Sequence, residues 1–235
     1  MYLIYGQDAV GKSVQMKAIC EMTEHPLYIS MELKNRRLLG LDKLGQQTEQ
    51  SPFDVLEALV ITPDYKIDPI ETYEKLGSII QDVLNKPDEH DTVVIDGISE
   101  IPKYTEKVVL KRLQDAKPEA HIKMIGKDNL AAWAARNNLA HMPMEQLSSW
   151  AVLHDKKVFL TSLMTDEYIG EKKVGRCVDA KDRLRKLCDV RVMLTCDGRG
   201  RLADFEKVPD GCDGTNPVVI GKGGLAGEFM KRGLL

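Results

Sequence analysis

The sequence predicts an α/β protein with a mostly parallel central sheet flanked by helices and a C-terminal antiparallel extension. Short apolar runs alternate with longer segments of helical periodicity, which is typical of a parallel sheet covered on both faces. Polar residues directly follow four of the expected strands, namely Gly6, Glu32, Asp96 and Ser162, and ligands of such sheets bind at the carboxyl ends of strands. Residues 196–235 combine short strands with Gly- and Asp-rich turns, which favours antiparallel pairing.

The composition is that of an ordinary soluble globular protein. The chain has 235 residues, 43% of them hydrophobic and 29% charged, enough for one domain with a substantial core. We expect a single domain over 1–235, with a helical insertion at 117–155 and C-terminal strands and a short helix at 196–235. No apolar run approaches the roughly 20 residues that span a bilayer, and no signal-peptide pattern opens the chain. A cytoplasmic location without membrane contact is therefore expected. Five cysteines without a CxxC pair indicate neither a zinc site nor a disulfide framework.

The strongest motif is a phosphate-binding loop near the N-terminus. Gly6-x-x-x-x-Gly11-Lys12-Ser13 follows the apolar run Tyr2–Tyr5 and precedes a helical pattern over Val14–Glu24, which is the context that such a loop needs. Backbone N–H groups and the helix dipole would cradle phosphates. Lys12 would reach the β- and γ-phosphates, and the Ser13 hydroxyl would bind Mg²⁺. The residues expected to contact ATP are Gly6, Gln7, Asp8, Ala9, Val10, Gly11, Lys12, Ser13 and Val14.

The stretch after the loop helix predicts strands and helices in alternation. Leu27–Met31 has the character of a buried strand and delivers Glu32 at its carboxyl end. A charged, leucine-bearing stretch over Lys34–Gln47 is expected as a surface helix, and Ala58–Ile61 as a further strand. Asp68–Leu84 predicts an amphipathic helix, because it has apolar periodicity and opens with an Asp-Pro pair.

The second half of the chain predicts two more buried strands. Thr92–Ile95 is a β-branched run followed by Asp96, and Val158–Thr161 is an apolar run that ends at Ser162. The expected helices are Tyr104–Asp115, Asn129–Arg136 and Met144–His154. The expected late elements are a polar stretch over Thr165–Lys181, strands at Val190–Leu194, Leu202–Phe205 and Val218–Ile220, and a short terminal helix.

Two acidic residues are expected to serve the phosphate loop. An aspartate directly after a hydrophobic strand is the pattern found opposite such loops, so Asp96 is expected to hold Mg²⁺, directly or through water. Phosphoryl transfer to water also needs a group that orients the water. Glu32 and Glu100 are the candidates. Many oligomeric ATPases carry this glutamate directly after the metal aspartate, but Gly97 stands there, which favours Glu32.

The order of these features resembles the RecA-like ATPases over nearly the whole chain. GQDAVGKS is followed by LYISMEL, then by LEALVITPDYKIDPIETYEKL, TVVIDGISEI and VFLTS, and finally by a polar loop and DRLRKLCDVRVML. Within that group the chain looks most like short nucleotide-binding proteins of phages and archaeal viruses, related to single-strand annealing ATPases. The resemblance implies a RecA-like P-loop NTPase with ATP and Mg²⁺ as cofactors.

The resemblance also implies roles for individual residues. Lys12 and Ser13 would bind phosphate and metal, Asp96 would organise the metal, and Glu32 would be the catalytic base or the residue that orients water. Thr161 or Ser162 would sense the γ-phosphate, although Leu163 and Met164 follow where members of the group often carry Gln or His. Lys207 is the candidate for a basic residue that reaches a neighbouring subunit's nucleotide, without the Lys-x-Arg pair that the group tends to use.

A DNA-binding role is predicted for basic residues of the late polar stretch. Lys172, Lys173 and Arg176 lie around Gly170 and Gly175. A second basic set consists of Lys117, Lys123 and Lys127, and solvated surface charge remains the alternative for both sets. The net charge of −3 argues against broad nucleic-acid binding by a monomer, so DNA contacts would be repeated around an oligomer. The tryptophans, Trp133 and Trp150, either stack on bases or, as is commoner, belong to the core.

Three functions are compatible with these observations. The first is a Mg-dependent ATPase that acts on single-stranded DNA as a ring or filament, in phage or viral recombination, annealing or replication. The second is a small-molecule kinase for nucleosides or nucleotides, with Arg36 and Arg37 binding an acceptor phosphate. The third is a nucleotide-gated assembly or packaging factor with low hydrolysis.

Overall fold

The computed structural model describes residues 1–118, 125, 129–169, 172–178, 182–198, 200–212, 216–221 and 223–235, with backbone alone for 166–169, 172–178 and 182. The strands are β1 Tyr2–Gly6, β2 Pro26–Ser30, β3 Asp54–Glu57, β4 Thr92–Asp96, β5 Lys157–Ile169, β6 Lys172–Val178, β7 Val190–Asp197, β8 Gly200–Lys207 and β9 Val218–Val219. The α-helices are α1 Lys12–Cys20, α2 Arg36–Leu39, α3 Pro69–Asn85, α4 Ile101–Ala116, α5 Leu130–Leu153, α6 Asp182–Leu187 and α7 Gly224–Lys231; 3-10 turns form at Leu33–Asn35 and Ile98–Glu100. In these residues no helix is long and apolar enough to cross a membrane.

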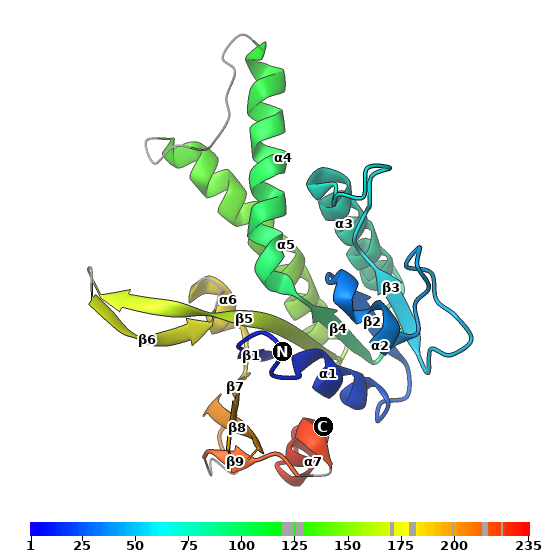
Figure 1. Ribbon diagram of the computed structural model, residues 1–235, viewed down its shortest axis with the longest axis vertical. Helices are drawn as coiled ribbons and strands as arrows, with labels where there is room; N and C mark the ends of the chain where they lie inside the picture. The colour runs from blue at the N-terminus through cyan, green and yellow to red at the C-terminus, as the bar shows by residue number, and fades with distance from the viewer. Residues whose placement is uncertain are drawn as a thin grey trace.

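The central sheet has the strand order β3-β2-β4-β5-β1-β7-β8-β9 (Figure 1). Every pair from β3 to β7 is parallel, whereas β8 and β9 add to the far edge in antiparallel pairs. The predicted fold class is therefore confirmed. Since the parallel strands point the same way, Gly6, Ser30 and Asp96 all lie where the strands have their carboxyl ends.

The two faces of the sheet bury separate apolar clusters. Leu3 and Tyr5 of β1 belong to the cluster that includes residues of α3, α4, α5 and α6, and Ile4 belongs to the one that includes residues of α1 and α7. This alternation follows from the two-residue period of a strand. It explains why the strand sequences are continuously apolar rather than alternating.

Two predicted elements between β2 and α3 are wrong. The expected helix over Lys34–Gln47 is only a 3-10 turn followed by α2, because Gly40 ends α2 in a left-handed conformation with φ 70°. The expected strand at Ala58–Ile61 lies instead at Asp54–Glu57. A charged residue is acceptable in that strand because Glu57 is paired there with Arg36.

The two helices expected over Asn129–Arg136 and Met144–His154 are one continuous helix, α5, with Pro143 inside it. A proline lacks the N–H that would bond to the carbonyl four residues earlier, which here is that of Leu139. The structure supplies a replacement, because the Tyr73 hydroxyl from α3 donates to the Leu139 carbonyl at 2.8 Å. The proline is thus tolerated because a neighbouring helix satisfies the carbonyl that it leaves free.

The polar stretch expected as a loop over Thr165–Lys181 is mainly a β-hairpin. Strand β5 continues past the sheet to Ile169 and pairs antiparallel with β6, and Figure 1 shows this ribbon extending away from the body of the molecule. The sequence there lacks the apolar alternation on which strand prediction depends. The ribbon carries the backbone of Lys172, Lys173 and Arg176.

The pairing of Tyr73 with Leu139 predicts a conditional loss of stability. Tyr73→Phe should lower the free energy of unfolding by about 1–2 kcal/mol, because it leaves the Leu139 carbonyl without its donor. In a Pro143→Ala background the restored backbone N–H can bond to that carbonyl, so the same change should cost less. Urea unfolding of the four proteins measures this coupling. An equal cost in both backgrounds would contradict the account of Pro143.

Candidate nucleotide site

The phosphate loop connects the end of β1 to the start of α1. Gly11 has φ 95° and Ala9 has φ 59°, both left-handed, so the chain turns sharply enough for its N–H groups to converge. Gly6 is required by space, since a Cβ there would collide with the Leu194 carbonyl oxygen. No side chain caps the first turn of α1. Its N–H groups are therefore left for an anionic ligand.

The Lys12 ammonium is folded back over this loop. Its Nζ donates to the Gly6 carbonyl at 3.1 Å and to the Gln7 carbonyl at 2.8 Å, and the residue is only 8% exposed. Burial lowers the pKa of Lys12, while the negative charges of Glu32 and Asp96 oppose that shift. A poorly hydrated cation is thus placed where the β- and γ-phosphates of a nucleotide would lie.

A pocket of about 420 Å³ opens beside the loop. It is lined by loop residues, by residues that follow β2, and by one residue of β8, among them Asp8, Lys12, Ser13, Glu32, Asn35 and Arg201. The sequence predicted the first four of these as site residues, whereas Asn35 and Arg201 were not expected there. The pocket therefore brings together segments from the beginning and the end of the chain.

Asp96 lies beneath the pocket as a buried carboxylate with 1% exposure. Its Oδ2 accepts hydrogen bonds from the Tyr28 hydroxyl at 2.6 Å and from Asn35 Nδ2 at 2.7 Å, and its Oδ1 accepts one from the Thr161 hydroxyl. Burial raises the pKa of Tyr28, and the charge of Asp96 adds to that effect, so Tyr28 stays a neutral donor. With three donors, the carboxylate retains room for one further contact at Oδ1.

Glu32 faces the pocket from the carboxyl end of β2, with its side chain 19% exposed. Burial and the charge of Asp96 raise the pKa of Glu32, and Lys34 acts in the opposite direction. Lys34 Nζ lies 3.2 Å from Glu32 Oε2 and 2.5 Å from Asp8 Oδ1. This lysine joins the residue after β2 to the phosphate loop.

Gly97 leaves the space that Glu32 occupies. Its φ is 103°, and a Cβ at this position would lie 2.9 Å from the Glu32 Cγ. The absence of a glutamate directly after Asp96 and the presence of one after β2 are therefore linked by packing. The other candidate, Glu100, is paired with Lys103 at 2.8 Å on the first turn of α4.

The two hydroxyls expected to sense the γ-phosphate are buried. Thr161 donates to Asp96 and accepts from the Gly97 N–H at 2.9 Å. The Ser162 hydroxyl lies 2.9 Å from that of Ser99. Both side chains thus support the ends of β4 and β5.

The structure places Lys207 at the opposite end of β8 from Arg201. It lines a separate pocket of about 450 Å³ together with Arg185, Lys186 and Arg191, and its Nζ donates to the Cys188 carbonyl. The separation along the strand is six residues, or roughly 20 Å. Lys207 is therefore not beside its own phosphate loop.

The remaining predicted residues that the structure describes do not line this pocket. Of the second basic set, Lys117 is exposed after α4, while Lys123 and Lys127 fall outside the described residues. Trp150 is a core residue with 2% exposure, and the guanidinium of Arg136 lies 4.8 Å from the centre of the Trp133 ring.

Sequence reasoning missed five residues of the site: Tyr28, Lys34, Asn35, Leu38 and Arg201. Tyr28 lies in β2, and Lys34 and Asn35 lie in the 3-10 turn after β2, where the sequence predicts the start of a long helix. Alternation in β8 puts Arg201 on the same face as Ala203 and Phe205, but only the structure shows that this face packs in the cluster that includes residues of α1.

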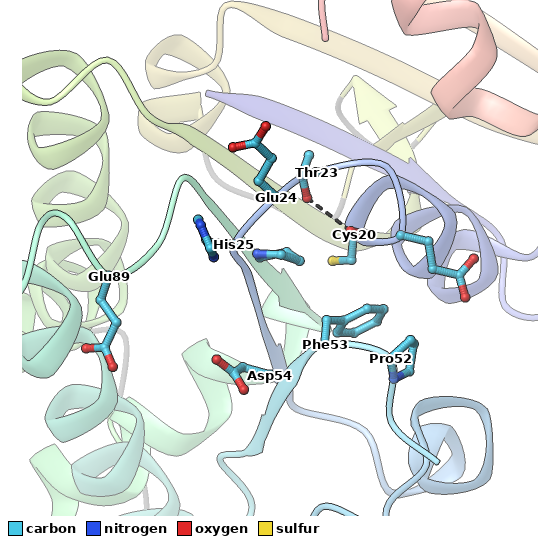
Figure 2. A pocket seen from close by; sticks show the side chains of 10 residues that line it. Cys20, Thr23, Glu24, His25, Pro52, Phe53, Asp54 and Glu89 are labelled. Carbon is cyan, nitrogen blue, oxygen red and sulfur yellow. Dashed lines mark hydrogen bonds between the residues drawn. The ribbon is translucent and has the colours of Figure 1, made fainter. Parts of the chain in front are cut away.

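A third pocket, of about 270 Å³, lies near the amino ends of β2 and β3 (Figure 2). Figure 2 shows the side chains of Glu24, His25, Asp54 and Glu89 around it. Within the described chain, no group of three or more His, Cys, Asp or Glu residues is arranged to hold a metal ion. This pocket lacks the phosphate-binding chemistry of the loop.

A phosphate loop at the carboxyl edge of a sheet ordered β3-β2-β4-β5-β1 defines a RecA-like P-loop fold. Among solved structures, that of the RadB recombinase is similar, with a TM-score of 0.51 and 16% sequence identity over 95% of this chain and 88% of that one. No protein-family profile and no curated protein matches the sequence. The structural likeness establishes the fold.

The contact between positions 97 and 32 can be tested by stability measurements. Gly97→Ala should lower the free energy of unfolding by more than the roughly 1–2 kcal/mol that a left-handed backbone costs a non-glycine residue, because the new Cβ also meets Glu32. In a Glu32→Ala background the loss should fall to the backbone part and the contact of the new Cβ with the Met31 Cβ at 3.3 Å. Urea unfolding of both single variants and the double variant separates the two parts. If the loss is the same with and without Glu32, the two positions do not compete for space.

Proposed function

We propose that this protein is a Mg-dependent ATPase that acts on single-stranded DNA as a homo-oligomer, in recombination, annealing or replication of viral DNA. The observation that carries the proposal is that Lys12 and Glu32 line one pocket at the phosphate loop, while the buried Asp96 carboxylate is hydrogen-bonded to Asn35 of the same lining. Hydrolysis of a triphosphate needs a phosphate cradle, a metal site and a group that orients water. Each of these has a candidate here.

Mg²⁺ would be held by few protein atoms. Ser13 lines the pocket at the start of α1, and Asp96 keeps one position free at Oδ1. Mg²⁺ is usually bound by one or two protein groups together with waters and substrate phosphates. This donor set fits such a site: Ser13 would bind the ion, and Asp96 would hold a water bound to it.

Glu32 would orient the attacking water. It is the carboxylate that lines the pocket from the segment after β2, and its elevated pKa makes it a better proton acceptor than an ordinary surface glutamate. The Lys34 contact would hold it in place before the nucleotide arrives. Thr161 or Ser162 would then transmit the state of the γ-phosphate along β5 to the ribbon.

DNA would contact the β5–β6 ribbon through Lys172, Lys173 and Arg176. The support is that three basic residues occur on β6, on a ribbon that extends from the strand next to the phosphate loop strand. The pocket around Lys207 supports the oligomer. Lys207 is too far from its own phosphate loop, and in a ring or filament it would face the nucleotide of the neighbouring subunit.

The kinase alternative is less well supported. Arg36, one of the two residues expected to bind an acceptor phosphate, forms two hydrogen bonds to the Glu57 carboxylate, at 2.7 and 2.5 Å. That pairing raises the pKa of Arg36 and ties the residue to β3. A nucleotide-gated assembly factor with low hydrolysis is an outcome of the following test.

Steady-state ATP hydrolysis with Mg²⁺, with and without single-stranded DNA, tests the proposed activity. Lys12→Ala should abolish hydrolysis and weaken ATP binding. Glu32→Gln should retain ATP binding and lose turnover by roughly 100-fold or more, the usual contribution of a general base. Normal turnover by Glu32→Gln would refute its role. ATP binding without turnover in the wild-type protein would support the assembly factor instead.

The DNA-binding role of the ribbon can be tested by charge reversal. Lys172→Glu with Lys173→Glu should weaken binding to single-stranded DNA and reduce the salt dependence of log K by roughly 0.7 for each phosphate that is no longer neutralised. The matched control is Lys75→Glu with Lys107→Glu, which changes net charge equally at exposed positions of α3 and α4. Fluorescence anisotropy at several salt concentrations measures both slopes. Equal behaviour of the two double variants would exclude the ribbon.

A further inference from the structure

We propose that Arg201 is a nucleotide-binding residue that contacts the α- and β-phosphates held by its own chain's loop. This inference rests on the proposed nucleotide site and adds to it a cation from the C-terminal extension. Arg201 lines the pocket beside the loop although it is 190 residues away in sequence from Gly11. It is the residue of β8 that reaches this pocket.

The backbone of Arg201 is fixed by strands on both sides. It pairs with Cys196 of β7 in the antiparallel ladder, and its carbonyl accepts from the Ile220 N–H at 2.8 Å. Ala203 and Phe205 follow on the same face of β8 and are buried against residues of α1 and α7. Alternation therefore directs the Arg201 side chain to the face of the sheet that carries α1 and the phosphate loop.

The guanidinium lies over Gly11. A Cβ built on Gly11 would be 3.1 Å from Arg201 Nε, 3.3 Å from Cζ and 3.4 Å from Nη2. Gly11 thus leaves room for the arginine as well as for its own left-handed turn. A planar guanidinium at this distance presents several N–H donors to whatever the loop binds.

The C-terminal extension is held firmly on the loop helix. The Leu225 N–H of α7 donates to Gln15 Oε1 at 2.6 Å inside the protein. Val10 of the loop, Ala203 of β8 and Phe229 of α7 belong to one buried cluster. Packing between the extension and the loop helix accordingly fixes where the backbone of Arg201 lies relative to the loop.

The charges around the pocket leave Arg201 available for a phosphate. Lys34 is engaged by Asp8 and Glu32, whereas Arg201 has no carboxylate partner among the residues that the structure describes. Guanidinium groups bind phosphate through paired, charge-assisted hydrogen bonds. A triphosphate brings about four negative charges to a site in which Lys12 is otherwise the main unpaired cation.

The location over Gly11 selects the inner phosphates. The N–H groups at the end of a phosphate loop bind the α- and β-phosphates, and the loop lysine reaches the β- and γ-phosphates. Lys12 Nζ lies at the other side of the loop, near the Gly6 and Gln7 carbonyls. Arg201 should therefore bind ADP and ATP about equally.

The test is to measure Kd for Mg-ATP and for Mg-ADP by isothermal titration calorimetry, without DNA and independently of turnover. Arg201→Ala should weaken both by roughly 10- to 100-fold, the usual value of hydrogen bonds to a charged group. Arg201→Lys, which keeps the charge but not the fork, should lie between Arg201→Ala and the wild type. Arg112→Ala, at an exposed position of α4, is the matched control and should bind as the wild type does.

Each other outcome has a definite meaning. If Arg201→Ala binds both nucleotides like the control, the inference is wrong while the proposed site stands. If only ATP binding weakens, the contact is with the γ-phosphate and the assignment to the inner phosphates is overturned. If the wild-type protein binds ADP and ATP but does not hydrolyse ATP, the proposed ATPase activity is refuted. The Kd values of the Arg201 variants still test the proposed phosphate contact. Circular dichroism and thermal unfolding establish that each variant folds, and Arg201→Lys serves as the milder change if Arg201→Ala does not.

Discussion

The buried carboxylate of Asp96 is the constraint on which the site depends. A negative charge with almost no exposure is stable only when donors surround it, and here Tyr28, Asn35 and Thr161 supply them from β2, the turn after β2 and β5. These bonds tie together the carboxyl ends of three neighbouring strands. The same ends position Glu32 and the Gly97 turn. The need of the Asp96 carboxylate for hydrogen-bond donors thus determines how the carboxyl ends of these strands are arranged.

Much of the fold could be predicted because its parallel core depends on local patterns. The apolar runs of β1, β2, β4 and β5 and the Asp-Pro start of α3 follow from hydrophobicity and capping, and Asp68 does cap α3 by accepting from the Ile70 and Glu71 N–H groups. The spacing of Gly6, Gly11 and Lys12 identified the phosphate loop. These features depend on interactions close in sequence or on burial alone, so the sequence carries them directly.

The remainder depends on partners distant in sequence. Pro143 predicts a break in α5 unless one knows that Tyr73 satisfies the freed carbonyl. Strand β3 contains a buried glutamate that is acceptable only because Arg36 reaches it. Arg201 reaches the pocket only because β8 pairs with β7, the strand that pairs with β1. Each of these requires a tertiary contact, which periodicity and propensity do not encode.

The exclusion between Gly97 and Glu32 has a consequence for how such a site can change over evolutionary time. A glutamate can stand after β2, as Glu32 does, or directly after Asp96, but a side chain at position 97 would meet Glu32 Cγ at 2.9 Å. Moving the carboxylate from one position to the other needs two substitutions. If position 97 changes first, the two side chains collide. If position 32 changes first, neither carboxylate is present. The two arrangements are therefore not connected by single substitutions that keep one unhindered carboxylate throughout.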